Sequence, residues 1–312
     1  MEKGKKAEQV AIIGSGSAGL TAAIYCARAD LSPLVVTGYE EGGQLTLTTA
    51  VENFPGFSAG VLGPSLMQEM RKQAEKFGAK FIFAKAVSFS KGPGIFKIGL
   101  DSGEEVIARA VIAATGASAR FLGIPGEKEL VGKGVSTCAT CDAHFYRGKG
   151  VAVVGGGDSA CEEALHLAKF AESVTLIHRR DKLRASKIMQ ERLLSNPKVS
   201  IIWDSAVEKV SGSEKLESIL LKNLKTGETR AFPVDGLFLA VGHIPNTEIF
   251  KGLVEMNELG YLKSGKSTAT NVPGFFAAGD VADPRYRQAI TAAGEGCKAA
   301  LEAERYLTEQ EV

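Results

Sequence analysis

Two cysteines followed at once by an acid are the residues of this chain best suited to chemistry. They are Cys138, Cys141 and Asp142, within the stretch 136–146. A Cys-x-x-Cys pair can close as a disulfide, open as two thiols and close again, because both sulfurs lie on one turn of chain. Two alternatives remain open: half of a zinc site, or two small buried apolar side chains. A zinc site needs a second Cys or His pair, and His144 and the other cysteines are too scattered to supply it, so no metal is expected.

Composition is that of an ordinary soluble globular protein. The chain has 312 residues, enough for about two domains, of which 45% are hydrophobic and 23% charged. Lys and Arg number 37 against 36 Asp and Glu, so no global charge favours nucleic acid or an anionic membrane surface. The start is polar, unlike a secretory signal, and no apolar stretch is long enough to span a bilayer. We therefore expect a cytoplasmic protein with no nucleic-acid or membrane partner.

A glycine-rich turn near the amino end predicts a first dinucleotide-binding fold. The β-branched run 10–13 leads into Gly14, Gly16 and Gly19, and an Ala-rich helical pattern follows over 20–29. In this G-x-G-x-x-G pattern the first glycine permits the turn and the second lets the backbone approach a pyrophosphate. The third lets the helix pack close to the strand.

The rest of this first region predicts further parts of the same fold. Its second strand, expected at 34–37, ends in Thr37 where an acid usually holds a ribose. Glycine-rich loops at 42–45 and 51–56 suit a flat ligand close to the backbone. The sequence then predicts a helix at 66–77, a small β-meander at 81–107 and a buried strand at 110–116.

The plan of strand, glycine turn and helix occurs again in the second half. A strand at 151–154 leads into the glycines 155–157 and a helix over 161–170. A β-rich stretch at 199–232 and a buried strand at 236–242 follow. Two copies of one plan imply two dinucleotides.

The second copy differs from the first in its charge. Its second strand, 173–177, ends in His178, Arg179 and Arg180, with Arg184 close behind. An NAD site would place an acid there, whereas a guanidinium offers a fork of donors to the 2′-phosphate of NADPH. The alternative is a solvated basic face, but basic side chains are poorly placed at a helix start unless an anion is bound.

A last buried strand, 272–279, ends at Asp280 and is followed by an Ala- and Gly-rich helix. An Asp at a strand end can bind a ribityl hydroxyl, and the amino end of the next helix can support negative charge on a reduced flavin. The alternative, a plain strand-to-helix turn with Asp as the helix cap, remains open.

Together these motifs resemble those of the bacterial low-molecular-weight thioredoxin reductases. The resemblance extends from Val10 to about Leu307, and only the run C-A-T-C-D is decisive by itself. Two positions depart from the family pattern: Ser17 stands where Pro is common, and Ala143-His144 where Gly and an aromatic residue often follow the Asp. The motifs are Gly14–Gly19, Gly42–Leu45, Val51–Gly56, Ala114–Ala117, Cys138–Asp142, Gly155–Gly157, His178–Asp181, Gly279–Val281 and Arg287–Ala289.

The resemblance implies an α/β fold of two Rossmann-like dinucleotide-binding domains, each with three layers (ββα), the second inserted in the first. The FAD-binding domain would comprise residues 1–117 and 245–312, and the NADPH-binding domain, which carries the redox disulfide, residues 118–244. Contacts with non-covalently bound FAD carry over to Gly14, Gly16, Gly19, Thr37, Gly43, Gln44, Asn53, Asp280, Arg287, Gln288 and Ala289. Contacts with NADPH carry over to Gly157, Asp158, Ser159, His178, Arg179, Arg180 and Arg184.

The resemblance also implies a reaction, in which electrons pass from NADPH to FAD, to a Cys138–Cys141 disulfide and then to oxidised thioredoxin. Cys141 would be the sulfur nearest the flavin, Cys138 the attacker of the thioredoxin disulfide, and Asp142 the general acid. The enzyme would be a homodimer whose inserted domain rotates between the two half-reactions.

Three other functions compete with this one. A reductase that serves a peroxidase usually carries an additional N-terminal redox domain, whereas here the first strand begins at Val10. A reductase fed by ferredoxin or by another flavin should lack the arginine cluster. A nucleotide-binding module without turnover would not need the intact C-A-T-C-D.

Overall fold

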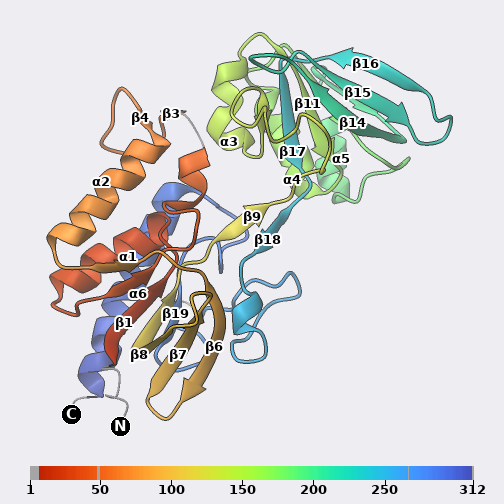
Figure 1. Ribbon diagram of the computed structural model, residues 1–312. Coiled ribbons are helices and arrows are strands. Elements are labelled where there is room, and N and C mark those ends of the chain that lie inside the picture. The colour runs from red at the N-terminus through yellow and green to blue at the C-terminus, as the bar shows by residue number, and fades with distance from the viewer. Residues whose placement is uncertain (1–6, 48–49, 266, 311–312) are drawn as a thin grey trace. The chain divides into compact units, whose positions relative to one another are not determined.

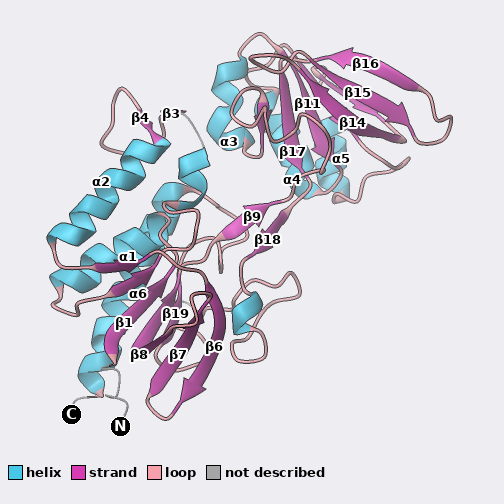
Figure 2. Ribbon diagram, viewed as in Figure 1, coloured by secondary structure: helices cyan, strands magenta, loops and turns pink. Residues whose placement is uncertain are grey.

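The computed structural model describes residues 7–47, 50–265 and 267–310. The chain divides into two compact units (Figure 1): unit 1 is Met1–Ser118 with Ile244–Val312, and unit 2 is Ala119–His243. Unit 2 is thus inserted in the sequence of unit 1. Each unit combines parallel strands with helices, so the predicted α/β class is confirmed (Figure 2).

The main sheet of unit 1 has the strand order β5-β2-β1-β8-β7-β6, with β19 also paired to β8. Its strands are β1 (Glu8–Ile13), β2 (Leu34–Val36), β5 (Lys80–Ile82), β6 (Ala86–Gly92), β7 (Ile95–Leu100), β8 (Glu105–Ala113) and β19 (Phe275–Ala277). The same unit contains α1 (Ser17–Arg28), α2 (Gly63–Lys76), α6 (Ala289–Glu309), the hairpin β3 (Ala50–Val51) and β4 (Val61–Leu62), and the 3₁₀ turns η1 (Gly43–Leu47) and η3 (Glu248–Phe250).

Two hydrophobic cores face the two sides of this sheet. On one side α1 and α6 pack over Val10 and Ile12 of β1. On the other, Phe89 and Phe96 of the β-meander belong to the core that contains Ile13. Alternate residues of β1 therefore serve opposite cores, as the two-residue period of a strand requires. The result is three layers: helices, parallel sheet and meander.

Strand β8 joins two features that the sequence suggests are separate. The meander is expected to end at 107 and a buried strand to begin at 110, but Glu105–Ala113 is one continuous strand. Its first half pairs antiparallel with β7, and its second half pairs parallel with β19. No glycine or proline lies within it, so nothing breaks the strand between its two pairings.

Unit 2 contains a parallel sheet in the order β10-β17-β11-β12-β13 and a separate antiparallel sheet β14-β15-β16. Its strands are β10 (Val135–Ser136), β11 (Gly150–Gly155), β12 (Ser173–Ile177), β13 (Val199–Ile202), β14 (Ser205–Ser211), β15 (Ser218–Asn223), β16 (Thr229–Pro233) and β17 (Gly236–Ala240). Its helical segments are α3 (Ala139–Asp142), α4 (Asp158–Leu167), α5 (Lys187–Leu194) and the 3₁₀ turn η2 (Ala143–Tyr146).

The parallel sheet of unit 2 also lies between two cores. Helices α3 and α4 pack over Val151 and Val153 of β11, and the antiparallel sheet covers Ala152 on the opposite side. Residues 199–202, the start of the predicted β-rich stretch, form β13, which extends the parallel sheet beside β12 and does not join the antiparallel sheet.

Three helices begin three residues earlier than hydrophobic periodicity indicates. They start at Ser17, Gly63 and Asp158, where the pattern predicts 20, 66 and 161. Their first turns consist largely of small or polar residues, which carry no periodic signal.

The two connections between the units pair with each other. They are β9 (Ala117–Ala119) and β18 (His243–Pro245), which form a two-stranded sheet. Among the described residues, no helix is both long enough and apolar enough to cross a membrane.

Candidate functional site

The two predicted redox cysteines are joined in a disulfide directly after β10. Cys138 and Cys141 have Cα atoms 5.4 Å apart, and the backbone N–H of Cys141 donates to Sγ of Cys138 at 3.2 Å. Both residues are half-buried. Within the described residues, no group of three or more His, Cys, Asp or Glu could hold a metal ion. The two sulfurs therefore stand as a closed pair that is partly accessible to solvent.

Asp142 ends α3, immediately after the second cysteine. Burial raises the pKa of its carboxyl, and the hydrogen bond from Ser136 and the nearby His144 oppose this with smaller effects. A carboxyl with a raised pKa holds its proton closer to neutral pH, which a general acid requires. The predicted acid therefore has an environment that suits the role.

The disulfide loop is fixed to the helix that follows the second glycine turn. Ala139 and Ala143, on either side of Cys141, are each 1% exposed and share a core with Ala160 and Ala164 of α4. Ala143 is one of the departures from the family pattern, and its methyl group is part of this contact. The loop is thus held to α4 by apolar packing.

Strand order brings the disulfide and the second glycine turn to one edge of the sheet. Strands β10, β17, β11 and β12 are all parallel, so their carboxyl ends lie at the same edge. The disulfide follows β10, the glycine turn follows β11, and the arginine cluster follows β12. This edge is where open α/β sheets bind ligands.

The second glycine turn fits a dinucleotide pyrophosphate. Gly157 precedes α4, no side chain caps this helix, and a Cβ on Gly157 would meet nothing within 4 Å. The carboxylate of Asp158 accepts hydrogen bonds from the backbone N–H and hydroxyl of Ser186, at 2.7 and 2.9 Å, and Ser159 is exposed. The open backbone at the start of a helix is a suitable anion site.

The side chain of His178 is buried, unlike those of the arginines that follow it in the sequence. It is 5% exposed, and its ring nitrogens contact the carbonyl oxygens of Gly155 (Nδ1, 2.7 Å) and Lys182 (Nε2, 3.0 Å). A Cβ on Gly156 would come within 2.1 Å of the ring. The imidazole is therefore turned inward, where it ties the loop after β12 to the glycine turn.

The three arginines remain exposed around this anchored loop. Arg179 and Arg180 directly follow His178, and the backbone N–H of Arg184 donates to the carbonyl of Gly156 at 2.7 Å. The chain that carries Arg184 is thus held against the glycine turn. Guanidinium groups beside a pyrophosphate site are the donors that a 2′-phosphate requires.

In unit 1 the first glycine turn forms a similar cradle. A Cβ on Gly14 would lie 2.2 Å from the carbonyl oxygen of Ala114, and one on Gly19 would lie 1.9 Å from that of Gly14. A Cβ on Gly16 would meet nothing within 4 Å, and one on Gly43 would lie 3.4 Å from Cα of Gly16. Gly14 and Gly19 thus serve close packing, whereas Gly16 leaves open backbone at the start of α1, as a pyrophosphate needs.

Thr37 directly follows β2, at the carboxyl edge of the sheet of unit 1, but its side chain is turned inward. It is 4% exposed, and its hydroxyl donates to a backbone carbonyl, that of Gly38 (2.9 Å) or Ile82 (3.2 Å). Its own carbonyl accepts the hydroxyl of Ser15 at 3.0 Å, and Ser15 in turn accepts the N–H of Gly42 at 3.1 Å. Ser15 therefore links three loops of the site, and its signal in the sequence is a polar residue inside a buried glycine turn.

The early and late segments of unit 1 meet at the predicted flavin residues. The side-chain amide of Asn53 donates to the side-chain oxygen of Gln288 at 3.3 Å. Gln288 precedes α6, which begins at Ala289, and Gln44 is exposed on η1. The structure thus brings together two motifs that lie 235 positions apart.

Asp280 lies in a cluster of charges near the start of α6. Burial, with help from Asp283, raises its pKa to about 6, and Arg287 opposes the shift. Glu295 of α6 accepts the N–H of Gly279 at 2.7 Å, and burial raises its pKa too. The site therefore holds two acids whose pKa values burial raises.

Comparison with known proteins identifies the family of the chain. The sequence pattern of the pyridine nucleotide-disulphide oxidoreductases matches residues 8–296. The chain belongs to this family. The thioredoxin reductase of Streptomyces coelicolor is 54% identical over 300 residues, which cover 96% of this chain and 93% of that protein.

Solved structures of the family resemble the chain over almost its full length. A thioredoxin reductase from Giardia duodenalis is 46% identical, covers 96% of this chain and 98% of its own, and has a TM-score of 0.91. The Lactococcus lactis thioredoxin reductase in its FR conformation is 41% identical, covers 97% and 99%, and has a TM-score of 0.66. Thioredoxin reductases of this family use FAD and NADPH, and the two glycine cradles fit two such dinucleotides.

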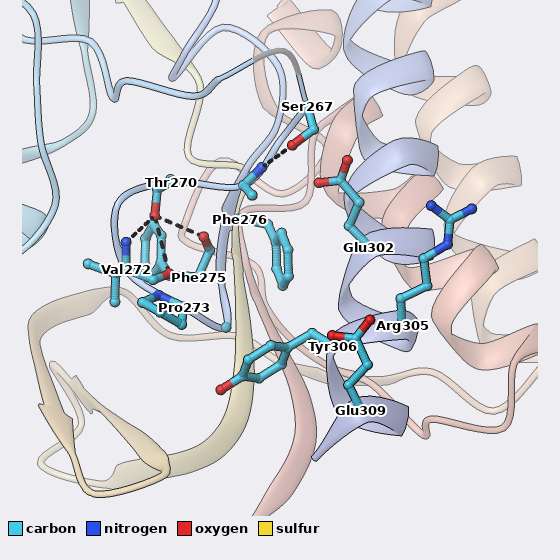
Figure 3. Close-up of a pocket in the computed structure, with 12 residues that line it drawn as sticks. Ser267, Thr270, Val272, Pro273, Phe275, Phe276, Glu302, Arg305, Tyr306 and Glu309 are labelled. Atoms are coloured by element: carbon cyan, nitrogen blue, oxygen red, sulfur yellow. Dashed lines mark hydrogen bonds between the residues drawn. The ribbon is translucent and has the colours of Figure 1, made fainter. Parts of the chain in front are cut away.

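A pocket elsewhere in unit 1 is separate from this oxidoreductase site. It lies between the loop before β19 and the end of α6, with Thr270, Phe276, Glu302 and Tyr306 among its lining residues (Figure 3). The loop precedes β19, whereas Asp280 follows it, so the pocket lies at the opposite end of that strand. The three hydrogen bonds drawn at Thr270 hold its hydroxyl within its own loop.

Proposed function

We propose that the protein is a thioredoxin-disulfide reductase, which transfers electrons from NADPH through FAD and the Cys138–Cys141 disulfide to oxidised thioredoxin. One observation carries this proposal: a disulfide followed by an acid of raised pKa lies at the same sheet edge as a glycine cradle and three arginines. The relatives named thioredoxin reductase match nearly the whole chain and support it.

We assign FAD to unit 1 and NADPH to unit 2. In unit 1, FAD would lie along the first glycine cradle, with Asn53, Asp280 and Gln288 near its flavin end. In unit 2, NADPH would place its pyrophosphate at Gly157 and its 2′-phosphate among the arginines. His178 and Thr37 would act indirectly, by fixing the loops from which the contacts are made.

The electron pair crosses the protein in a fixed order. The first glycine cradle would hold FAD and the second NADPH; together the two groups would supply the two electrons that open the Cys138–Cys141 disulfide. The Cys138 thiolate attacks one sulfur of the thioredoxin disulfide, forming a mixed disulfide and releasing the other sulfur as a thiolate, which Asp142 protonates. The Cys141 thiolate then attacks Cys138, which restores the enzyme disulfide and releases the second thioredoxin sulfur as a thiolate, which takes its proton from solvent.

We also propose that unit 2 rotates relative to unit 1 between the two half-reactions. The disulfide and the second glycine cradle both belong to unit 2, yet each must reach the flavin in its own half-reaction. One open flavin face cannot serve both at once. In support, the two solved relatives have similar identity and coverage but widely different TM-scores, which a single rigid shape for the family would not produce. The paired connections β9 and β18 are the proposed hinge.

We also propose that the enzyme is a homodimer in the cytoplasm. In support of a reducing compartment, Cys26, Cys161 and Cys297 are unpaired thiols. Light scattering coupled to gel filtration tests the dimer, and a mass of one chain at micromolar concentration would exclude it.

The assignment is tested with Cys138→Ser and Cys141→Ser, and with Cys297→Ser as a matched control outside the redox loop. In an anaerobic titration NADPH should still bleach the flavin of all three variants, because hydride transfer precedes the disulfide. Turnover of thioredoxin should be lost in the first two and kept in the third. Substantial thioredoxin turnover by either redox variant would remove the disulfide from the reaction.

A further inference from the structure

A lysine from the antiparallel sheet of unit 2 lies beside the loop that carries the three arginines. Lys225 is in the turn between β15 and β16, and its Nζ is 2.7 Å from Oδ2 of Asp204. The backbone N–H of Asp204 donates to the carbonyl oxygen of Arg180 at 3.3 Å. One ion pair and one backbone hydrogen bond thus link the lysine to the arginine loop.

Strand order places this lysine at the ligand-binding edge of the parallel sheet. Strands β11, β12 and β13 are neighbours and parallel, so their carboxyl ends lie in a row at one edge. The glycine turn follows β11, the arginines follow β12, and Asp204 comes two residues after the end of β13. A dinucleotide with its pyrophosphate at the first strand places its ribose at the second. A cation beside Asp204 therefore flanks the 2′-phosphate position on the side away from the glycine turn.

Hydrogen bonds fix the turn that carries Lys225. The backbone N–H of Leu224 donates to the carbonyl oxygen of Asp204 at 2.6 Å, which ties the turn to the end of β13. The side-chain oxygen of Asn223 accepts the N–H groups of Lys225 and Thr226, at 2.9 and 3.0 Å. The backbone of Lys225 is thus held in place, whereas its side chain is 66% exposed and accessible to a ligand.

The ammonium of Lys225 has donors to spare. It carries three N–H groups, and Asp204 needs only one of them. The bond to Asp204 raises the pKa of Lys225, and the charge of Asp181 adds a smaller increase, so the ammonium stays charged at neutral pH. An exposed ion pair of this kind contributes little to folding, so the lysine is not needed to keep unit 2 folded.

We propose that Lys225 is a further specificity residue for NADPH: its ammonium donates to the 2′-phosphate while Asp204 holds it beside the arginines. The inference deepens the proposed function and rests on it, since it takes unit 2 as the NADPH-binding unit. Lys225 comes from the antiparallel sheet and lies outside the spacing of the glycine fingerprint, so only the folded chain brings it to the site.

The test measures the binding of NADP⁺ and NAD⁺ to oxidised, FAD-loaded enzyme by isothermal titration calorimetry. These nucleotides differ only in the 2′-phosphate, and neither can give a hydride to the flavin, so binding is measured without turnover. Lys225→Met removes the charge and keeps the length of the side chain, and Lys225→Arg keeps a cation. Lys222→Met is the matched control, because Lys222 of β15 also forms a 2.7 Å ion pair, with Glu208.

Lys225→Met should bind NADP⁺ about five- to tenfold more weakly, as loss of one charge-assisted hydrogen bond predicts, and should bind NAD⁺ as wild type does. Lys225→Arg and Lys222→Met should bind both nucleotides as wild type does. The loss caused by Lys225→Met should persist in an Asp204→Asn background, because Asn still accepts a bond from the lysine but has no charge to neutralise.

Unchanged NADP⁺ binding by Lys225→Met would overturn the inference, as would an equal loss for NAD⁺. Disappearance of the loss in the Asp204→Asn background would also overturn it, since Lys225 would then serve only to neutralise Asp204. These outcomes differ from failure of the proposed function, in which the wild-type enzyme would bind NADP⁺ no more tightly than NAD⁺.

Discussion

Asp280 is an acid whose burial in unit 1 should make the stability of the apoprotein depend on pH. Its pKa is raised from 3.8 to about 6, chiefly by burial. The folded state therefore binds this proton more tightly than the unfolded chain does. The stability from Asp280 is then fully present below its unfolded pKa of 3.8 and is lost as the pH rises through about 6.

Asp280→Asn should remove this dependence. Between about pH 4 and pH 7 the wild-type apoprotein should lose at most about 3 kcal/mol of unfolding free energy through Asp280, and the Asn variant should not. Urea unfolding of FAD-free protein at several pH values measures this. Asp101→Asn is the control: a bond from Tyr39 lowers the pKa of Asp101 from 3.8, so its contribution changes only below this range and the variant should keep the wild-type slope. Parallel curves for wild type and Asp280→Asn would show that Asp280 does not titrate in this range.

The arginines after β12 should decide which nicotinamide nucleotide is preferred. Replacing Arg179 and Arg180 with Gln should raise KM for NADPH far more than for NADH, losing about 2–4 kcal/mol of discrimination, because only NADPH carries the 2′-phosphate. Steady-state kinetics with both nucleotides measure the ratio. Arg192→Gln, on the nearby α5, is a matched control. An equal loss for NADPH and NADH would mean that the arginines only shape the loop.

For single residues, the sequence predicts which side chains can take part in chemistry better than it predicts the direction in which they point. Cys138, Asp142 and the arginines could be found because their side chains have few other uses in that order and spacing. His178 and Thr37 end strands beside them, but both side chains turn inward to backbone carbonyls. Which way a side chain turns depends on carbonyl groups brought close by folding, and the motif does not contain that information.

Within the first glycine turn, substitutions at two glycines should have different effects, one on FAD binding and the other on the stability of the fold. Gly16→Ala adds a methyl group to open space, so the apoprotein should keep its stability but bind FAD poorly. Gly19→Ala places a methyl group against the carbonyl of Gly14, so the fold itself should lose about 1–3 kcal/mol. FAD content and thermal unfolding of the apoprotein separate the two effects.

The same comparison can be made in the second glycine turn, with Gly157 and Gly156 of unit 2. Gly157→Ala should resemble Gly16→Ala, because its added methyl group would meet nothing within 4 Å. Gly156→Ala should resemble Gly19→Ala, because the His178 ring lies in its way. In unit 1, normal FAD binding by Gly16→Ala would contradict the assignment of the first glycine turn to the FAD pyrophosphate.

At the scale of elements, strands and helices with strong periodicity could be predicted, and those defined by long-range pairing could not. The succession of strand, glycine turn and helix in both units follows from local patterns, as does the β-meander. The continuity of β8 depends on β19, more than 160 positions later, and β13 joins the parallel sheet only because β12 lies beside it. Helix α5 buries only Leu193, so its apolar pattern is too weak to predict.

For the whole molecule, the inserted position of unit 2 would allow the rotation that we propose. Both chain connections run through the short pair β9 and β18, and each end of this pair is tied within its own unit. In unit 1, Asn246 exchanges hydrogen bonds with Thr115 at 2.7 and 2.9 Å. In unit 2, the buried Glu127 accepts the N–H groups of Leu122 and Gly123 at 2.7 and 2.8 Å. Bending is thus expected between these ties, while each unit stays rigid.

The proposed hinge predicts two populations of distance between the units. Spin labels on non-canonical residues at Lys91 of β6 and Lys209 of β14 leave the disulfide intact, and both positions are exposed on strands. Pulsed electron resonance of the FAD-loaded enzyme should show two distances, and NADP⁺ should shift their ratio, because only one arrangement places the nicotinamide at the flavin. A second pair, Lys91 with Lys72 of α2, lies within unit 1 and should give one distance that NADP⁺ does not change. A single distance between the units, the same with and without NADP⁺, would leave the disulfide and the nicotinamide competing for one flavin face with no motion to separate them, and the rotation would have to be abandoned.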